Sequence, residues 1–443
     1  MAKYVSLRDE KYNVEKVKSY RYLLWVILFA TLSVSAYLGY LGFIKSIPST
    51  LTIREHREEM IKFQLPVSTS IYEESLPVSS LSGEMVDGIQ TQRIETRTAS
   101  SFVMKANDCN GYQMDVKLFG VIPVKTVDLQ VVEETKVYPV GLPVGIYLKT
   151  DGVLVVDIST FEDGAGNKVE PAKYALKKGD YVLEVNGESV HGKKDLIKRI
   201  RKSNGEDLIF TLCRNGEKTQ VKCTPVQSDD GEYKIGVWVR DSAQGIGTIT
   251  YLDTEGNFGA LGHGINDVDT SELMHLKYGG IYATDIIGIE KGADGKPGEL
   301  TGMISFDDEK QLGEVLQNTK GGVFGQLSKT EIDSMDLTSV EVGYKQEIKV
   351  GDAKILCKMK DENRLYDVKI TKVNYESKED NRGIVLEITD EELLEETGGI
   401  VQGMSGSPII QDGKIVGAVT HVLVNDPTRG YGIFIENMLE HDN

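Results

Sequence analysis

The chain has 443 residues, of which 40% are hydrophobic and 27% charged, a balance that supports about three domains of ordinary size. This composition excludes a mainly disordered protein and a multi-span transporter. Asp and Glu outnumber Lys and Arg by 68 to 50, and the resulting charge of −18 repels phosphate backbones, so nucleic acid is not an expected partner. The 46 glycines against 11 prolines indicate many tight turns and therefore a body rich in β-strands.

An uncharged apolar segment lies near the N-terminus. Residues 22–44 carry no charge over 23 positions, and a helix needs about 20 residues to cross a bilayer. Basic residues are concentrated in residues 1–21, which predicts a cytoplasmic N-terminus and an exported body. A cleaved signal peptide is the alternative, but its apolar core spans only about 7–15 residues, so we predict a retained single-pass transmembrane helix.

Two segments follow this helix. Residues 45–110 are rich in Ser, Thr, Glu and Gly without a sustained apolar period, which predicts a loosely structured tether. Residues 111–135 contain two runs of alternating apolar and polar residues, which predict a linking β segment.

Residues 136–226 show the pattern of a separate α+β unit. Two strands on either side of an Asp151-Gly152 turn precede PAKYALKKGDYVLEVNG, and the amphipathic helix KKDLIKRIRK follows. This order resembles a bacterial PDZ domain, a fold that binds the free C-terminus of a peptide by strand addition beside a helix. The resemblance implies that Lys194 to Lys202 form one wall of the groove. It also implies a carboxylate-binding loop made of Gly141, Leu142, Pro143, Val144 and Gly145, for which a simple turn before a strand is the alternative.

A hairpin closes this unit. The Asn215-Gly216 pair favours a two-residue turn, which places Cys213 opposite Lys218. Cys223 is then displaced by on the order of 16 Å along the strand, too far for a disulfide. We therefore predict free thiols.

Residues 227–443 consist of short alternating runs separated by glycine turns, which predict an antiparallel β-barrel or paired barrels. Within this region the segment Gly403-Met404-Ser405-Gly406-Ser407-Pro408 carries the strongest chemical signal. A serine nucleophile needs a base to remove its proton and preformed donors for the developing oxyanion. Flanking glycines allow the tight turn that such donors require, so we predict Ser405 as nucleophile and the backbone N–H groups of Gly403 and Ser405 as the oxyanion hole. Ser407 is less suitable because the proline that follows it restricts its backbone.

The base is sought among six histidines. His263 lies in Gly259-Ala260-Leu261-Gly262-His263-Gly264, where small neighbours permit the close approach of another loop, and we predict it as the general base. A carboxylate is expected to orient the imidazole. Asp390 at the end of a predicted strand, Asp267 and Asp269 are all candidates on sequence grounds.

The long motifs FGALGHGINDVDT and TGGIVQGMSGSPIIQDGKIVGAVTHVLVNDPTRGYGIFIENML resemble the stage IV sporulation protein B family, membrane-anchored PDZ-containing serine peptidases of endospore-forming bacteria. The resemblance implies a chymotrypsin-like peptidase with a His263, Asp390 and Ser405 triad, although Asp390 lies unusually close to Ser405 in sequence. It requires no cofactor, and no metal-binding spacing occurs in the chain.

The resemblance also implies a place and a role. The protein is expected in the forespore inner membrane, with its body in the space between the two membranes. There it would process itself and cleave the exported part of a membrane protein complex that restrains an intramembrane protease, which activates a late mother-cell sigma factor. We expect self-cleavage in the exposed tether, between Ser49 and Asp108.

Two other functions are compatible with parts of the sequence. A noncatalytic PDZ scaffold that gathers membrane proteins would not need Ser405, His263 and the flanking glycines together. A Ser–Lys protease would need Lys414 as its base, but this residue lies in a predicted hairpin turn that is expected to be solvated.

Overall fold

The computed structural model describes residues 2–73, 94–106, 111–359, 362–375, 377 and 380–441. By its internal contacts the chain divides into two compact units, residues 1–134 and 135–443, which are described separately. Part of the region in which self-cleavage is expected, residues 74–93 and 107–108, lies outside the described residues.

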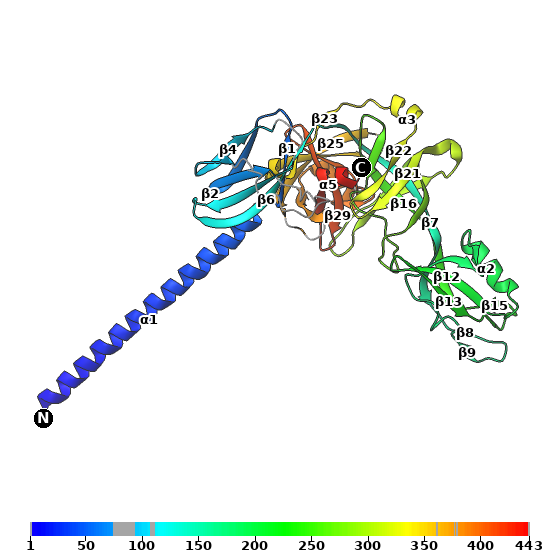
Figure 1. Cartoon of the computed structure of the whole chain (residues 1–443), viewed down its shortest axis with the longest axis horizontal. Helices are drawn as coiled ribbons and strands as arrows, with labels where there is room; N and C mark the ends of the chain where they lie inside the picture. The colour runs from blue at the N-terminus through cyan, green and yellow to red at the C-terminus, as the bar shows by residue number, and fades with distance from the viewer. Residues whose placement is uncertain are drawn as a thin grey trace, which may run out of the picture. The chain divides into compact units, whose positions relative to one another are not determined.

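The first unit begins with helix α1 (Ala2–Lys45), seen as the long blue helix in Figure 1. Its part from Lys18 to Lys45 is long and apolar enough to cross a membrane, with a mean hydropathy of 1.8. Large apolar side chains along it, such as Trp25 and Phe29, are exposed. Their exposure is what a helix in contact with lipid requires, so the helix is compatible with single-pass anchoring.

A sheet with the order β1-β6-β5-β2-β3 follows, and β4 also pairs with β2. Its strands are β1 (Thr50–Arg54), β2 (Glu59–Glu73), β3 (Ile94–Glu95), β4 (Ala99–Met104), β5 (Tyr112–Leu118) and β6 (Ile122–Val132). Strand β1 runs parallel to β6, with Thr50 opposite Asp128. The tether prediction is therefore wrong for residues 50–73 and 94–104, because strands from 111–135 bury their apolar side chains.

The second unit contains two rings of six strands. The first ring closes through β7 (Lys136–Ile158), β16 (Val237–Leu252), β17 (Asn257–Ala260), β22 (Gly322–Leu327), β21 (Gln311–Thr319) and β18 (Leu276–Tyr282), which pairs back with β7. The second ring is a closed barrel of β24 (Gly351–Met359), β25 (Glu362–Val373), β26 (Ile384–Ile388), β30 (Asp426–Phe434), β29 (Lys414–Leu423) and β28 (Pro408–Gln411). Strand alternation directs one apolar face of each strand into its ring.

A PDZ-like part is inserted between β7 and β16. It contains β10 (Tyr181–Val185), helix α2 (Lys193–Lys202), β12 (Leu208–Arg214) and β13 (Glu217–Cys223), around a core that includes Leu196 and Ile200 of α2. Short pairs complete it, β8 (Phe161–Glu162) with β9 (Lys168–Val169) and β14 (Val226–Gln227) with β15 (Tyr233–Lys234). The predicted boundary at residue 136 differs from the structure, because β7 is one continuous strand that serves the first ring before it enters this part.

The predicted hairpin in this part is confirmed. Asn215 and Gly216 both have positive φ, and Cys213 lies opposite Lys218. Cys213 and Cys223 are free thiols, as the register requires.

Further strands and helices complete the second unit. Strands β19 (Thr284–Glu290), β20 (Gly298–Ile304) and β27 (Val401–Gln402) form a small sheet, and helix α4 (Glu391–Thr397) precedes β27. Helices α3 (Lys329–Ser334) and α5 (Ile435–His441) follow β22 and β30.

Candidate active site

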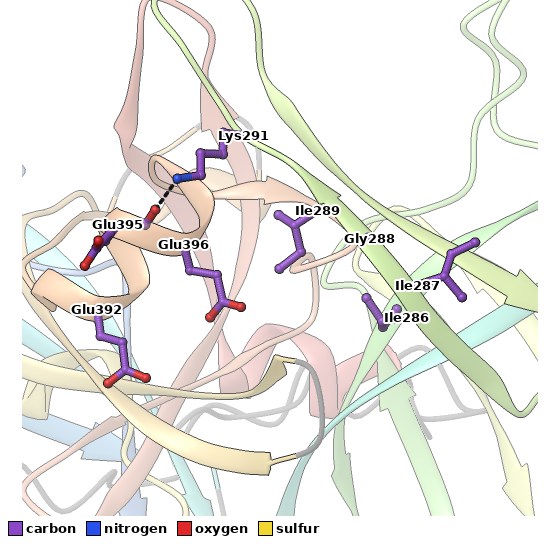
Figure 2. A pocket seen from close by; sticks show the side chains of 8 residues that line it. All are labelled: Ile286, Ile287, Gly288, Ile289, Lys291, Glu392, Glu395 and Glu396. Carbon is purple, nitrogen blue, oxygen red and sulfur yellow. Dashed lines mark hydrogen bonds between the residues drawn. The ribbon is translucent and has the colours of Figure 1, made fainter.

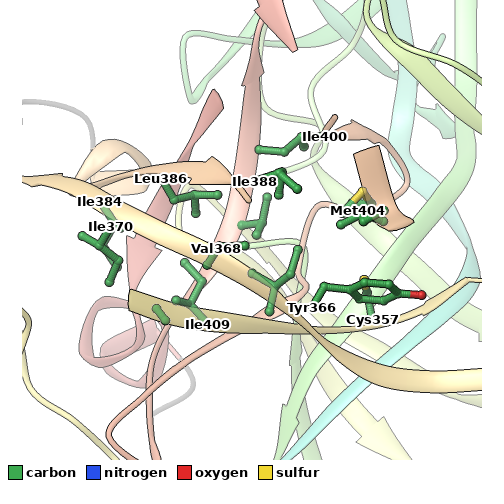
Figure 3. Packing of buried hydrophobic residues seen from close by; sticks show 14 of the residues in the cluster. Cys357, Tyr366, Val368, Ile370, Ile384, Leu386, Ile388, Ile400, Met404 and Ile409 are labelled. Atoms are coloured by element: carbon green, nitrogen blue, oxygen red, sulfur yellow. The ribbon is translucent and has the colours of Figure 1, made fainter. Parts of the chain in front are cut away.

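The Gly403–Gly406 loop connects β27 to β28. Gly403 has φ of 101° and Gly406 has φ of 98°, a backbone region that residues with a Cβ rarely adopt. A Cβ at Gly406 would lie 2.0 Å from the carbonyl oxygen of Thr248, so no other residue fits there. Met404, between the two glycines, is fully buried in the core of the second barrel (Figure 3). The buried Met404 and the crowded Gly406 therefore both hold the loop in its conformation.

Thr248 of β16 joins this loop to the first ring. Its N–H donates to the carbonyl oxygen of Ser405 at 2.9 Å, and its hydroxyl donates to that of Gly403 at 2.7 Å. The same residue accepts a hydrogen bond from the N–H of Leu261. Thr248 thus connects the loop of Ser405 to the segment of His263, although the two are far apart in sequence.

The Ser405 hydroxyl is partly accessible and donates to the carbonyl oxygen of Thr420 at 2.7 Å. Ser407, in contrast, is fully buried. Of the two serines, only Ser405 is placed where a substrate can approach it.

The backbone N–H groups of Gly403 and Ser405 donate no hydrogen bond within the part of the chain that the structure describes, whereas that of Gly406 donates to Val419. Two unused donors beside a serine hydroxyl are the type of group that stabilises an oxyanion.

His263 follows β17, at the edge of the first ring. The preceding Gly262 has φ of 67°, and a Cβ there would lie 2.9 Å from Cγ2 of Thr420. The His263 Nδ1 lies 3.0 Å from the carbonyl oxygen of Gly264. Because a carbonyl only accepts, Nδ1 is the protonated nitrogen and Nε2 keeps its lone pair. Burial lowers the pKa of His263, so the ring is neutral near pH 7.

Sequence reasoning did not assign a role to His421 of β29. Its ring centroid lies 4.8 Å from that of His263, at an interplanar angle of 40°. Burial lowers the pKa of His421 to about 4, and the charges of His263 and Arg382 act in the same direction. His421 directly follows Thr420, which accepts the hydrogen bond from Ser405. The sequence could not indicate a role for His421, because only the fold brings β29 close to the segment of His263.

Strand β29 links the two predicted residues, although no hydrogen bond joins Ser405 to His263 among the described residues. Thr420 binds the hydroxyl of Ser405, and the adjacent His421 contacts the ring of His263. The Ser405 loop and the His263 segment converge on two consecutive residues of one strand.

The structure places Asp390 elsewhere. Its carboxylate caps helix α4 by accepting from the N–H of Leu393 at 3.1 Å, and it also accepts from the N–H of Asp367. Arg364 lies 3.8 Å from it. No hydrogen bond joins Asp390 to His263 among the described residues.

The other two carboxylate candidates are also engaged. The guanidinium of Arg240 bridges Asp267, whose side chain is fully buried, and Asp269 at 2.7 Å. Burial acts to raise the pKa of Asp267, but hydrogen bonds from the N–H of Thr270 and from Arg240 hold it below its usual value. These carboxylates fold the segment that follows His263 and do not contact its ring.

Lys414 does not reach Ser405 either. Its ammonium group lies 2.5 Å from a carboxylate oxygen of Glu347 and 3.7 Å from one of Glu341. Two carboxylates therefore engage the ammonium group of Lys414, which has no hydrogen bond to Ser405 among the described residues.

The predicted carboxylate-binding loop is not a loop. Gly141, Leu142, Pro143, Val144 and Gly145 lie within β7. The last four of them pair with β16, Gly145 also pairs with β18, and Gly141 lies at a register shift between β7 and β16. Their backbone is part of the first ring and does not lie beside α2, so the structure differs from this prediction. The prediction failed because β7 is one continuous strand. The sequence GLPVG resembles a turn and gives no sign of that continuity.

A different strand edge lies next to α2. The first residues of β16, Val237 to Arg240, pair with β7, and no strand of the described chain pairs with their other edge. The carboxylate of Asp241 accepts from the N–H of Lys193, the first residue of α2, at 2.8 Å. This edge is the segment beside α2 that could accept an added peptide strand.

A groove of about 550 Å³ lies between β19 and α4 (Figure 2). One wall is apolar and the other acidic; it is lined by Ile286, Ile287, Gly288, Ile289, Lys291, Glu392, Glu395 and Glu396. The ammonium group of Lys291 donates to the carbonyl oxygen of Glu395. Strand β20 links this groove to the active loop, because it pairs with both β19 and β27 and its Leu300 packs against Gly403.

Two six-stranded antiparallel rings, with a serine loop on one and a histidine segment on the other, define a chymotrypsin-like serine peptidase. Residues 231–439 match the model of the SpoIVB peptidase S55 family. This part of the chain, just under half of it, belongs to that family, which confirms the resemblance seen in the sequence.

Solved structures show weaker similarity. The PDZ domain of the SdrC-like protein from Listeria monocytogenes is 21% identical, with coverage of 20% of this chain and 87% of that chain and a TM-score of 0.17. The HtrA-type protease AlgW with decapeptide is 8% identical, with coverage of 69% of this chain and 64% of that chain and a TM-score of 0.28. The strand topology described above defines the fold.

Proposed function

We propose that the protein is a membrane-anchored serine endopeptidase in which Ser405 attacks the peptide carbonyl and His263 acts as general base. The observation that carries the proposal is the convergence of the Ser405 loop and the His263 segment on Thr420 and His421. The neutral His263, with its lone pair on Nε2, is in the state that a general base needs.

The chemistry follows from these groups. The Ser405 hydroxyl leaves its hydrogen bond to Thr420 and transfers its proton to Nε2 of His263 while Oγ bonds to the carbonyl carbon. The N–H groups of Gly403 and Ser405 then stabilise the oxyanion. His263 returns the proton to the leaving amine, and water hydrolyses the acyl-enzyme by the same sequence.

The resemblance assigns Asp390 as the orienting carboxylate. In the structure the Gly264 carbonyl oxygen holds Nδ1–H of His263, and Asp390 caps α4. We therefore propose that Asp390 acts on His263 only after the start of α4 shifts when a substrate binds.

Family membership supports the proposed biological role. We propose that the enzyme is anchored by α1 in the forespore inner membrane with its N-terminus in the cytoplasm. It would process itself and cleave an exported segment of a membrane signalling complex during sporulation, which leads to activation of the late mother-cell sigma factor. The PDZ-like part would select partners through the β16 edge beside α2.

The groove beside α4 is proposed as a substrate subsite. Its isoleucine wall suits an apolar side chain, and its glutamates suit a neighbouring basic one. Its link through β20 to Gly403 supports this placement.

The test uses the full chain in detergent micelles or lipid nanodiscs. Ser405→Ala and His263→Ala are each expected to lower self-processing and peptide hydrolysis by at least about 10³-fold, and Ser405→Ala to abolish fluorophosphonate labelling. Ser407→Ala is the matched serine control for labelling. Undiminished labelling and shortening of Ser405→Ala would overturn the proposal and favour a noncatalytic scaffold.

A further inference from the structure

His421 is the group nearest to the predicted base that the mechanism above does not use. It lies on β29 directly after Thr420, so one strand holds both the acceptor of the Ser405 hydroxyl and a second imidazole. The 4.8 Å separation of the two ring centroids is a direct contact between side chains of the two barrels.

The buried nitrogen of His421 is the unusual feature. Its Nδ1 is inaccessible to solvent and has no hydrogen-bond partner among the described residues. A buried polar atom without a partner costs free energy, and such atoms call for an explanation in a folded protein. An unpaired acceptor is tolerated better than an unpaired N–H, so the proton lies on Nε2 and a lone pair on Nδ1.

The surroundings of His421 keep it neutral. The charged or titratable groups that act on it are His263, from the segment after β17, and Arg382, which lies over the ring of Tyr431. Both disfavour a proton on His421, and no carboxylate of the described residues acts against them. When His263 takes the proton of Ser405, His421 therefore remains an uncharged imidazole with an available lone pair.

We propose that His421 is a positioning residue whose Nδ1 lone pair stabilises the imidazolium form of His263 during acylation. His421 exchanges no proton: the proton moves from Oγ of Ser405 to Nε2 of His263 and later to the leaving amine. This inference rests on the proposed function.

The experiment compares two variants of the full chain whose new side chains, Asn and Leu, have nearly the same shape as each other. His421→Asn keeps an acceptor close to the position of Nδ1, whereas His421→Leu removes it. We expect His421→Leu to lower kcat for peptide hydrolysis about 10–100-fold with little change in KM. We expect His421→Asn to retain at least about ten times the kcat of His421→Leu.

The pH profile gives a second readout that packing alone would not move. Loss of the lone pair removes stabilisation of the protonated His263 and lowers the pKa of this residue. The acid limb of kcat/KM is therefore expected to shift to lower pH in His421→Leu and to stay near that of the parent in His421→Asn. His56→Leu is the histidine control, because its ring is exposed and belongs to the first unit, so neither kcat nor the acid limb is expected to change.

Equal kcat values and equal acid limbs for the Asn and Leu variants would overturn the proposal. If His421→Leu does not fold, as judged by thermal unfolding, His421→Phe takes its place in the same comparison. A failure of the proposed function would look different, because His263→Ala would then retain activity.

Discussion

Gly406 shows how one residue can determine the conformation of the Ser405 loop. Its φ of 98° and its closeness to the Thr248 carbonyl oxygen, which a Cβ would meet at 2.0 Å, both depend on the absence of a Cβ. The backbone of β16 can therefore pass close to the loop and present Thr248 to Ser405 and Gly403.

Gly406→Ala is expected to lower the free energy of unfolding by about 3 kcal/mol or more and to reduce fluorophosphonate labelling at least about 100-fold. Gly413→Ala is the control, since Gly413 also has positive φ, 78°, but open space around it. It is expected to cost only about 1 kcal/mol and to label normally. Chemical denaturation and labelling check both, and similar losses in the two variants would argue against the steric explanation.

Asp390 has two possible roles at the residue scale, and one substitution separates them. Asparagine is as good an N-cap as aspartate, so Asp390→Asn is expected to change stability by less than about 1 kcal/mol. If the carboxylate orients His263 in the substrate complex, kcat falls by about 10³-fold or more, which is the result we expect. A kcat near that of the parent would restrict Asp390 to capping α4.

At the scale of elements, β19 and α4 combine an apolar and an acidic wall next to the active loop. Neither element forms a groove by itself. The acidic wall is one face of the seven-residue helix α4 and consists of Glu392, Glu395 and Glu396. Glu391, in the first turn of the same helix, does not line the groove.

Glu395→Gln is expected to lower kcat/KM about 2–5-fold for peptides with Lys or Arg at the residue that enters the groove, because it removes one favourable charge at a partly solvated site. The effect is expected to decrease at high salt. Glu391→Gln is the matched control, since it lies on the same helix outside the groove. An equal effect of both variants, or none with basic substrates, would contradict a subsite here.

At the scale of the second unit, the PDZ-like part contacts the segment that follows His263. Arg240, at the start of β16, pairs with Asp267 and Asp269, and Tyr181 of β10 stacks on His275 at 4.3 Å. The proposed peptide-binding edge and the histidine segment therefore share one ion pair.

Arg240→Met leaves the fully buried Asp267 without its counter-charge, and we expect a loss of about 3 kcal/mol in unfolding free energy. We also expect peptide hydrolysis to fall several-fold, because the His263 segment loses its support. Arg201→Met is the control, since its partner Glu232 is exposed and the pair contributes about 1 kcal/mol or less. If the two variants behave alike, the ion pair does not support the catalytic segment.

The sequence by itself determined the features that depend on short-range patterns. The uncharged stretch 22–44 predicted an apolar helix, alternation predicted strands, and Asn215-Gly216 set the register of a hairpin. The glycines around Ser405 and His263 marked two loops that allow close backbone approach, because glycine tolerates positive φ wherever it occurs.

Only the tertiary structure decided which of these pieces meet. Residues 50–54 looked like tether but pair with β6, and GLPVG looked like a loop but lies in the continuous strand β7. The contact between His421 and His263 joins two barrels. Alternation and turn propensity act over a few residues, whereas the choice of a strand's partner, and hence of an active site's neighbours, is made by burial between segments that are far apart in the chain.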